Sequence, residues 1–346
     1  MTMTSVATTP TSAVTTSDAD PLVAEAQEYA GKLLLLSEGS VHKHFDPFVD
    51  IDWDNPDFDP DADPQRWILP ESADPLGRHP WYLALPEERK IAIGKYRQAN
   101  IAKVGLQFES ILISGMQQHV FGLPNGSPEF RYCSHEMIEE RYHTLMFQEM
   151  VNRVGVDVPG MGPLVRQLRY LGVPVAIAFP SLFFMAVLAG EEPIDHIQKD
   201  VLRSGEDVHP IMRGVMAIHI AEEARHISFA HEFLKHHVPQ RKPVSRAALS
   251  IAMPIVMWIL GRSIATPPKA FFTEFDIPDE VRNELFYGSK EARQVFSDYF
   301  IDVRALAAEL GLMNPVAERV WKLLRIDGPA SRYRSAPNRT IQPEII

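Results

Sequence analysis

The sequence is poor in cysteine, with Cys133 as the single one among 346 residues. One cysteine cannot form an intrachain disulfide, and it cannot build a cysteine-based zinc or iron–sulfur site. Such cysteine usage is typical of proteins that remain in a reducing compartment. We therefore expect a cytoplasmic protein.

Blocks of lysine and arginine are also missing, and the formal net charge is -11. Without a basic patch there is no footprint for phosphate groups, so we expect no nucleic-acid partner. The N-terminus is rich in Thr, Ser and Ala and has neither a basic region nor an apolar one. It does not resemble a signal peptide, and residues 1–19 are predicted to form a disordered arm.

Apolar runs long enough to cross a membrane are scarce as well. The two best candidates, residues 175–189 and 247–260, fall short of the ~20 residues that a spanning helix needs. Pro180 and Pro254 also interrupt them. We expect both to be core helices, with no membrane span.

The patterns that are present indicate a mostly α fold. Apolar residues recur at helical spacing, and no run of alternating strands is visible. Helices are predicted over residues 20–40, 87–119, 134–154 and 211–237, with two or three more beyond residue 243. The helix over 134–154 would have Ser134 as its N-cap and Glu136 in its first turn. Residues 45–75, which are acidic and rich in proline, are predicted to be extended on the surface.

These segments suggest one helical domain over residues 20–327, followed by a polar tail over residues 328–346. No internal repeat is apparent. The expected architecture is a ferritin-like helical bundle core with additional helices and an extended N-terminal arm.

One short pattern occurs on two of the predicted helices. Glu140 and His143 form a Glu-x-x-His motif on the first, and Glu223 and His226 form another on the second. Three-residue spacing places both side chains of a motif on the same helical face. A single such motif is common on solvated helices. The second helix, however, is apolar almost all round, which indicates burial, and buried carboxylates need partners or a metal.

A bundle that holds two metals needs two further carboxylates, one from each remaining helix. Glu109 is a lone acid among large apolar residues on the helix before the first motif. Between the motifs lie the neighbours Glu191 and Glu192, and either could complete the site. We favour Glu192, because the proline that follows it breaks regular helix geometry. His219, one turn before Glu223, is either an additional nitrogen ligand or a packed core histidine.

With these residues in place, the sequence resembles the p-aminobenzoate N-oxygenase family of dinuclear non-haem iron proteins. The resemblance rests on Glu109, on the two Glu-x-x-His motifs, on Glu192 and on the third histidine, His219, over roughly residues 87–237. It implies seven metal ligands and, from the spacing back from His219, Glu192 rather than Glu191. The implied ligand set is Glu109, Glu140, His143, Glu192, His219, Glu223 and His226.

The resemblance also implies an activity. Two Fe ions would activate O₂ and oxygenate the nitrogen of a small-molecule substrate, an aromatic amine, towards hydroxylamine and nitro products. Mn in one or both positions stays open. No flavin, dinucleotide or iron–sulfur motif supplies electrons, so an external electron donor, a reductase or a ferredoxin-like protein, is expected.

Two other functions remain as alternatives. The first is a di-iron hydroxylase, desaturase or oxidative-cleavage enzyme that acts on an apolar substrate, for which the Met and Phe residues near the expected site would be suited. The second is a non-catalytic iron-binding bundle. Such a bundle would need neither the long N-terminal region nor the additional helices. A homodimer is an assembly that the sequence leaves open.

Overall fold

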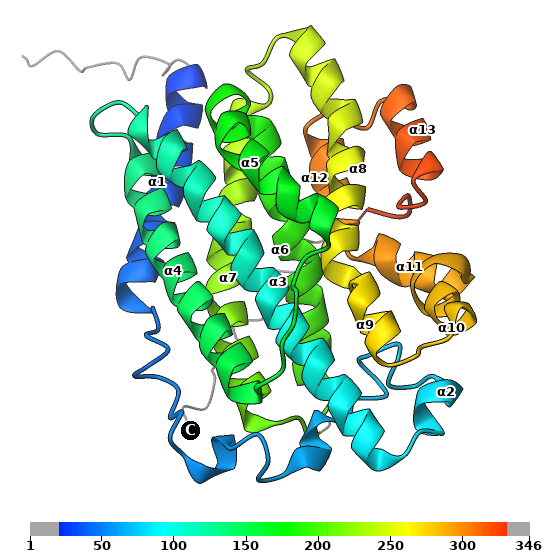
Figure 1. Cartoon of the computed structure of the whole chain (residues 1–346). Helices are drawn as coiled ribbons and strands as arrows, with labels where there is room; N and C mark the ends of the chain where they lie inside the picture. The colour runs from blue at the N-terminus through cyan, green and yellow to red at the C-terminus, as the bar shows by residue number, and fades with distance from the viewer. Residues whose placement is uncertain (1–20, 206, 331–346) are drawn as a thin grey trace, which may run out of the picture.

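The computed structural model describes residues 21–205 and 207–330 (Figure 1). These residues form helices and loops, with no strand among them, which confirms the predicted mostly α class. The arm over residues 1–19 and the tail beyond residue 330 lie outside the described residues. The elements are α1 (Pro21–His42), η1 (Pro56–Phe58), η2 (Pro64–Trp67), α2 (Pro80–Leu83), α3 (Glu87–Phe121), α4 (Pro128–Val154), α5 (Pro163–Ala178), α6 (Pro180–Arg203), α7 (Pro210–His237), α8 (Pro243–Ala265), α9 (Lys269–Glu274), α10 (Asp279–Asn283), η3 (Glu284–Gly288), α11 (Lys290–Asp298), α12 (Ile301–Glu309) and α13 (Pro315–Leu323).

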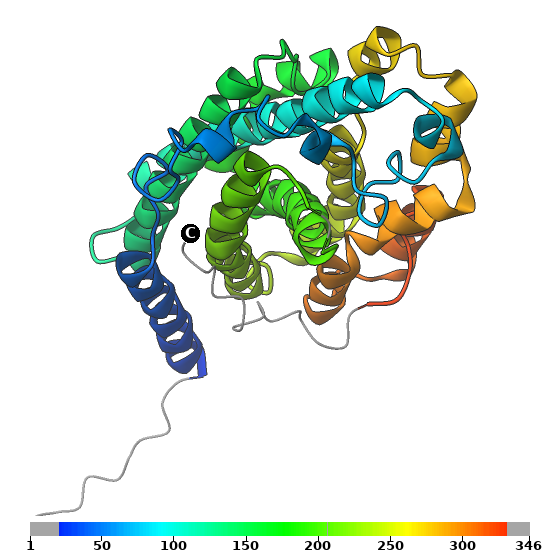
Figure 2. The ribbon, with the colours of Figure 1, turned by 90° about the horizontal axis from the view of Figure 1, so that it is seen from below.

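The centre of the molecule is a bundle of α3, α4, α6 and α7, in which each helix contacts two others. Seen from below, α6 and α7 lie inside an arc to which α1, α4 and α3 contribute (Figure 2). Outside this bundle, α1 packs on α4 and α7, α5 on α3 and α6, and α8 on α6. The bundle core with additional helices is the arrangement that the sequence predicted.

Proline marks the beginning of most of these helices. It opens α1, α2, α4, α5, α6, α7, α8 and α13, where its fixed φ suits the first turn and its missing N–H costs no hydrogen bond. Helix α4 begins at Pro128, so the prediction of Ser134 as its N-cap was wrong. The hydroxyl of Ser134 donates instead to the carbonyl of Phe130 within the helix. Glu136 consequently lies in the helix interior, where it is buried.

Two prolines that were expected to interrupt helices do not. Helix α6 continues through Pro193, and α8 continues through Pro254. Because α8 is continuous, residues Pro243–Glu274 are long and apolar enough to cross a membrane by length and composition alone. One third of that apolar window is buried inside the protein. The C-terminal part also contains more helices than predicted, since α8 to α13 lie at or beyond residue 243 and five of them are shorter than ten residues.

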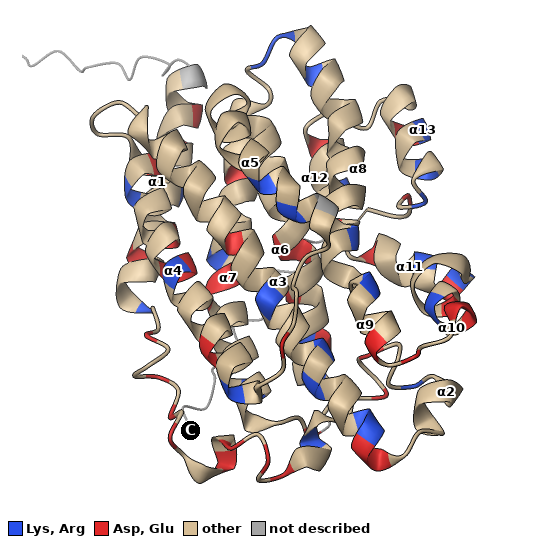
Figure 3. Ribbon diagram, in the orientation of Figure 1, with Lys and Arg blue, Asp and Glu red and all other residues tan. Residues whose placement is uncertain are grey.

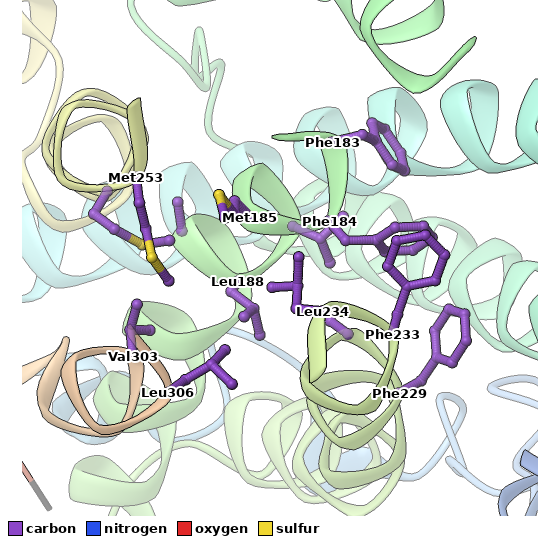
Figure 4. Close-up of a cluster of buried hydrophobic side chains, with 14 of the residues drawn as sticks. Phe183, Phe184, Met185, Leu188, Phe229, Phe233, Leu234, Met253, Val303 and Leu306 are labelled. Atoms are coloured by element: carbon purple, nitrogen blue, oxygen red, sulfur yellow. The ribbon is translucent and has the colours of Figure 1, made fainter. Parts of the chain in front are cut away.

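The buried apolar side chains form two clusters. One contains the aromatic and aliphatic residues of α6, α7, α8 and α12 that Figure 4 shows, including Phe184, Phe233 and Leu306. The other lies towards the opposite ends of α3, α4 and α7 and includes Tyr96, Phe147 and Val215. Along α7 the residues of the second cluster end at Ile218, and those of the first begin at Phe229. The residues of α7 between Ile218 and Phe229 contribute to a polar layer that separates the two clusters.

Candidate metal centre

The four central helices bring seven acidic and histidine side chains into one buried cluster. Helix α3 supplies one residue, α4 two, α6 one and α7 three, and all are at most 1% exposed. Figure 3 shows that acidic residues occur in the middle of this bundle and not only at helix ends. The seven are Glu109, Glu140, His143, Glu191, His219, Glu223 and His226, in overlapping groups whose possible ligand atoms lie within 4.8 Å of one another.

The groups divide the cluster into two neighbouring positions that share Glu223. At the first, His226 Nδ1 lies 3.0 Å from Glu140 Oε1 and 3.2 Å from Glu223 Oε1. At the second, His219 Nε2 lies 3.3 Å from Glu109 Oε1 and 3.4 Å from Glu223 Oε1. His143 Nδ1 lies between them, 3.4 Å from Glu140 and 3.9 Å from Glu109. Two neighbouring groups of carboxylates and imidazoles that share a glutamate would suit a dinuclear site.

The structure corrects the prediction for α6. Glu191, and not Glu192, faces the cluster, where it groups with His219 and Glu223. The carboxylate of Glu192 lies instead 3.1 Å from Nε2 of His231. Consecutive residues of a helix point about 100° apart, so only one of the two acids can face the bundle centre. Because α6 stays helical through Pro193, the expected break that favoured Glu192 does not occur.

Two further carboxylates, outside the seven, bind two of the histidines. Glu222 of α7 lies 2.8 Å from Nε2 of His143 on α4, while Glu139 of α4 lies 2.7 Å from Nε2 of His226 on α7. A carboxylate can only accept there, so each Nε2 carries a hydrogen, and each Nδ1 is the nitrogen that faces the cluster. Burial opposes the ionisation of Glu139, but His226 and then Arg225, which donates to it at 2.8 Å, lower its pKa to about 2.

Sequence reasoning gave no role to Glu139 and Glu222, each of which directly precedes a Glu-x-x-His motif. The signal was present, because both motifs begin with two consecutive glutamates. Glu222 has a further partner in the segment after α1, whose Phe45 N–H donates to it at 3.1 Å. The N-terminal segment thus supports the cluster from outside the four-helix bundle.

The electrostatics of the cluster favour the binding of positive charge. Burial, reinforced by Glu140, raises the pKa of Glu109 well above its usual range. Burial and the nearby Glu223 likewise raise the pKa of Glu191. For Glu140, burial opposes ionisation, but His226 and His143 hold its pKa below the ordinary value. Protons therefore substitute for metal charge, and metal binding would release them.

Unpaired polar atoms test whether the residues suit a metal. Both oxygens of Glu109, both of Glu140, one each of Glu191 and Glu223, and Nδ1 of His143 are buried without a hydrogen bond. Buried polar atoms are normally paired, and those that are not call for an ion or another ligand. Carboxylate oxygens with imidazole nitrogens form a donor set that suits iron or manganese. The residues present therefore fit a dinuclear metal centre.

Glu136 is another buried acid that sequence reasoning placed elsewhere. It lies one turn before Glu140, is fully buried, and neither of its oxygens has a hydrogen bond. Burial raises its pKa well above the usual range. We regard it as part of the surroundings of the centre.

Comparisons with known proteins agree with this geometry. A family model described as P-aminobenzoate N-oxygenase AurF matches residues 26–311. Two relatives, uncharacterized protein Mb0909 of Mycobacterium bovis and uncharacterized protein Rv0885 of Mycobacterium tuberculosis, are each 57% identical over 317 residues, or 92% of this chain and 93% of their own. No solved structure gives a significant match. The chain belongs to the p-aminobenzoate N-oxygenase AurF family.

Proposed function

We propose that this protein is a non-haem di-iron oxygenase that activates O₂ and oxygenates the nitrogen of an aromatic amine towards hydroxylamine and nitro products. Glu109, Glu140, His143, Glu191, His219, Glu223 and His226 would hold the two metals. The proposal rests on one observation above others. Seven buried ligand-type side chains from four helices turn oxygens and nitrogens towards one another, and most of their carboxylate oxygens have no hydrogen bond.

Charge balance supports two divalent metals. The four carboxylates carry -4 when ionised, and two ferrous ions carry +4, so the loaded site would be near neutral and stable in a buried position. Iron suits O₂ chemistry with a mixed carboxylate and imidazole ligand set, and manganese in one or both positions is the variant that the same donors allow.

The chain's own residues position and protect the chemistry. Bound iron would supply the activation of O₂. Glu222 and Glu139 fix the ring orientation of His143 and His226 and raise their basicity. His219 has no such carboxylate on its outer nitrogen and packs instead against the ring of Phe147 at 5.2 Å. It would thus be a weaker donor than the other two histidines. Electrons would come from an external donor, a reductase or a ferredoxin-like protein.

A second candidate is a di-iron hydroxylase, desaturase or oxidative-cleavage enzyme on an apolar substrate. The observation that favours it is an apolar cavity beside the cluster, which has no charged or polar lining residue. Both candidates use the same metal centre and differ in whether the substrate nitrogen is oxygenated or the carbon skeleton is oxidised.

Product analysis separates the two candidates. The iron-loaded protein would be reduced, exposed to O₂ with an alkyl-substituted aniline, and the products identified by mass spectrometry. We expect hydroxylamine and nitro products from the wild-type protein and much less from His219→Ala. Glu129→Gln is the matched control, because Glu129 is also a buried acid of α4 with histidine partners, His119 and His237, outside the cluster.

The outcome that contradicts N-oxygenation is oxygen on carbon only, which would establish the second candidate. If no product forms with any amine or hydrocarbon while iron is bound, the proposed oxygenase activity is wrong. An unchanged product yield in His219→Ala would reject the ligand role of His219.

A further inference from the structure

A cavity of about 210 Å³ lies between α3, α5, α6 and α8. Sixteen residues line it, and none of them has a charged or polar side chain. In volume it exceeds an apolar cavity of about 150 Å³ that is known to accept benzene. It therefore has room for an aromatic ring with a short apolar substituent.

The cavity and the acid–histidine cluster share two helices, α3 and α6, although no cluster residue lines the cavity. Phe108 lines it and directly precedes Glu109 on α3, while Val187 lines it one turn before Glu191 on α6. The ring of Phe108 packs against the backbone at Gly190, so closely that a Cβ on Gly190 would lie 2.1 Å from the ring. The helices that carry two of the acids therefore also form the wall of the cavity.

The lining offers no partner to a charged occupant. A carboxylate placed against these side chains would lose hydration and find no cation among them, which is unfavourable. Among the basic residues of α3, Arg97 is already paired with Asp74 and lies twelve positions, or about 18 Å, before Glu109. Arg225, beside the cluster, is taken by Glu139 and Glu222. An alkylamine is a cation at neutral pH, whereas an aromatic amine is neutral.

We propose that this cavity binds the apolar body of the substrate, and that the substrate is a neutral aromatic amine without a carboxylate. This inference rests on the proposed function, because it assumes that the cluster acts on a bound amine. It narrows the substrate class and separates this chain from an enzyme for p-aminobenzoate, whose para substituent is an anion. The amine nitrogen would be directed towards Phe108 and the cluster, and the alkyl-bearing end towards α5 and α8.

The test is a binding comparison between 4-butylaniline and 4-aminobenzoate, which share a ring and an amine and differ in the para group. Calorimetry on the iron-loaded protein without O₂ measures both affinities independently of turnover. We expect 4-butylaniline to bind more tightly by about tenfold or more. Its butyl group gains free energy on leaving water, whereas the carboxylate of 4-aminobenzoate does not.

Two variants locate the binding. Ala186→Phe fills the cavity from α6 and should weaken 4-butylaniline by about tenfold or more, whereas Ala247→Phe, at an exposed position of α8, should leave its affinity unchanged. Leu168→Arg, at a half-buried position of α5, places a cation in the wall and should reduce or reverse the preference. Circular dichroism verifies that each variant is folded, and Leu168→Arg remains informative if Ala186→Phe does not fold.

Tighter binding of 4-aminobenzoate than of 4-butylaniline would overturn the inference. So would affinities for 4-butylaniline that neither Ala186→Phe nor Leu168→Arg changes. If 4-butylaniline binds in the cavity but no oxygenated product forms, the proposed oxygenase function fails while the cavity assignment holds.

Discussion

The acid–histidine cluster and the apolar cavity are neighbours on α3 and α6, but their linings are opposite in character. The cluster gathers seven ionisable side chains whose ligand atoms have few hydrogen bonds, whereas the cavity has only apolar walls. Phe108 and the backbone at Gly190 lie beside both. An unpaired buried carboxylate destabilises the folded chain, but an empty apolar cavity costs far less. The cluster should therefore depend on its ligand for stability, and the cavity should not.

Metal removal should give the largest effect. Without metal, the raised pKa values of Glu109 and Glu191 favour their protonated forms. Metal binding to the folded state then no longer adds to the free energy of unfolding. At free metal about a thousandfold above the dissociation constant, the lost contribution is about 4 kcal/mol. Urea unfolding with and without a chelator measures it. Added 4-butylaniline should shift the unfolding midpoint much less than the metal does. A midpoint that the chelator leaves unchanged would contradict the expectation that the cluster depends on metal for stability.

Separate substitutions of the two neighbouring acids on α6 should give the second largest effect. Glu191→Gln removes a carboxylate that faces the cluster and should weaken metal binding by more than about a hundredfold. Glu192→Gln alters the pair with His231 instead and should weaken it by less than about tenfold. Competition with a chelator of known affinity measures both. The reverse ranking would restore the assignment made from the sequence.

Loss of one supporting carboxylate should have a moderate effect. Glu139→Gln removes the charge behind His226 while keeping the shape of the side chain, and metal affinity should fall by about 10–100-fold. Glu129→Gln, at the acid beside His119 and His237, should leave metal affinity as it is. Equal metal affinities in both variants would show that Glu139 does not support a ligand.

A change at the boundary between the two regions should be the smallest. Gly190→Ala places a methyl group against the ring of Phe108 and should destabilise the protein by about 1–3 kcal/mol. Gly31→Ala is the matched control, because nothing lies within 4 Å of its Cβ in α1, and it should stabilise the helix by about 0.5–1 kcal/mol. Thermal unfolding measures both. Equal changes in stability in the two variants would show that the close packing of Phe108 on Gly190 does not constrain this position.

The parts of this site that the sequence could predict are those that follow from helical periodicity. The Glu-x-x-His spacing places Glu140 with His143 and Glu223 with His226, whatever the surrounding fold. The surroundings of Glu109 were apolar enough to indicate burial. The choice between Glu191 and Glu192 depended on the rotation of α6 about its axis, which packing against its neighbours decides.

Other features depended on contacts between distant segments. The crossed pairs of Glu139 with His226 and of Glu222 with His143 join α4 to α7, and no local pattern contains them. The cavity is formed by four helices, none of which is unusual alone. Pro193 and Pro254 showed that tertiary packing can keep a helix continuous where local propensity predicts a break.

The most direct test of the account is the iron content of the folded protein. After anaerobic reconstitution with ferrous iron and removal of the excess, elemental analysis should give about two iron atoms per chain for the wild-type protein and for Glu129→Gln. Glu140→Ala and Glu191→Gln should retain clearly less. Wild-type protein that is folded but binds neither iron nor manganese, or variants of Glu140 and Glu191 that bind as much iron as the wild type, would contradict the assignment of the cluster as a dinuclear metal centre.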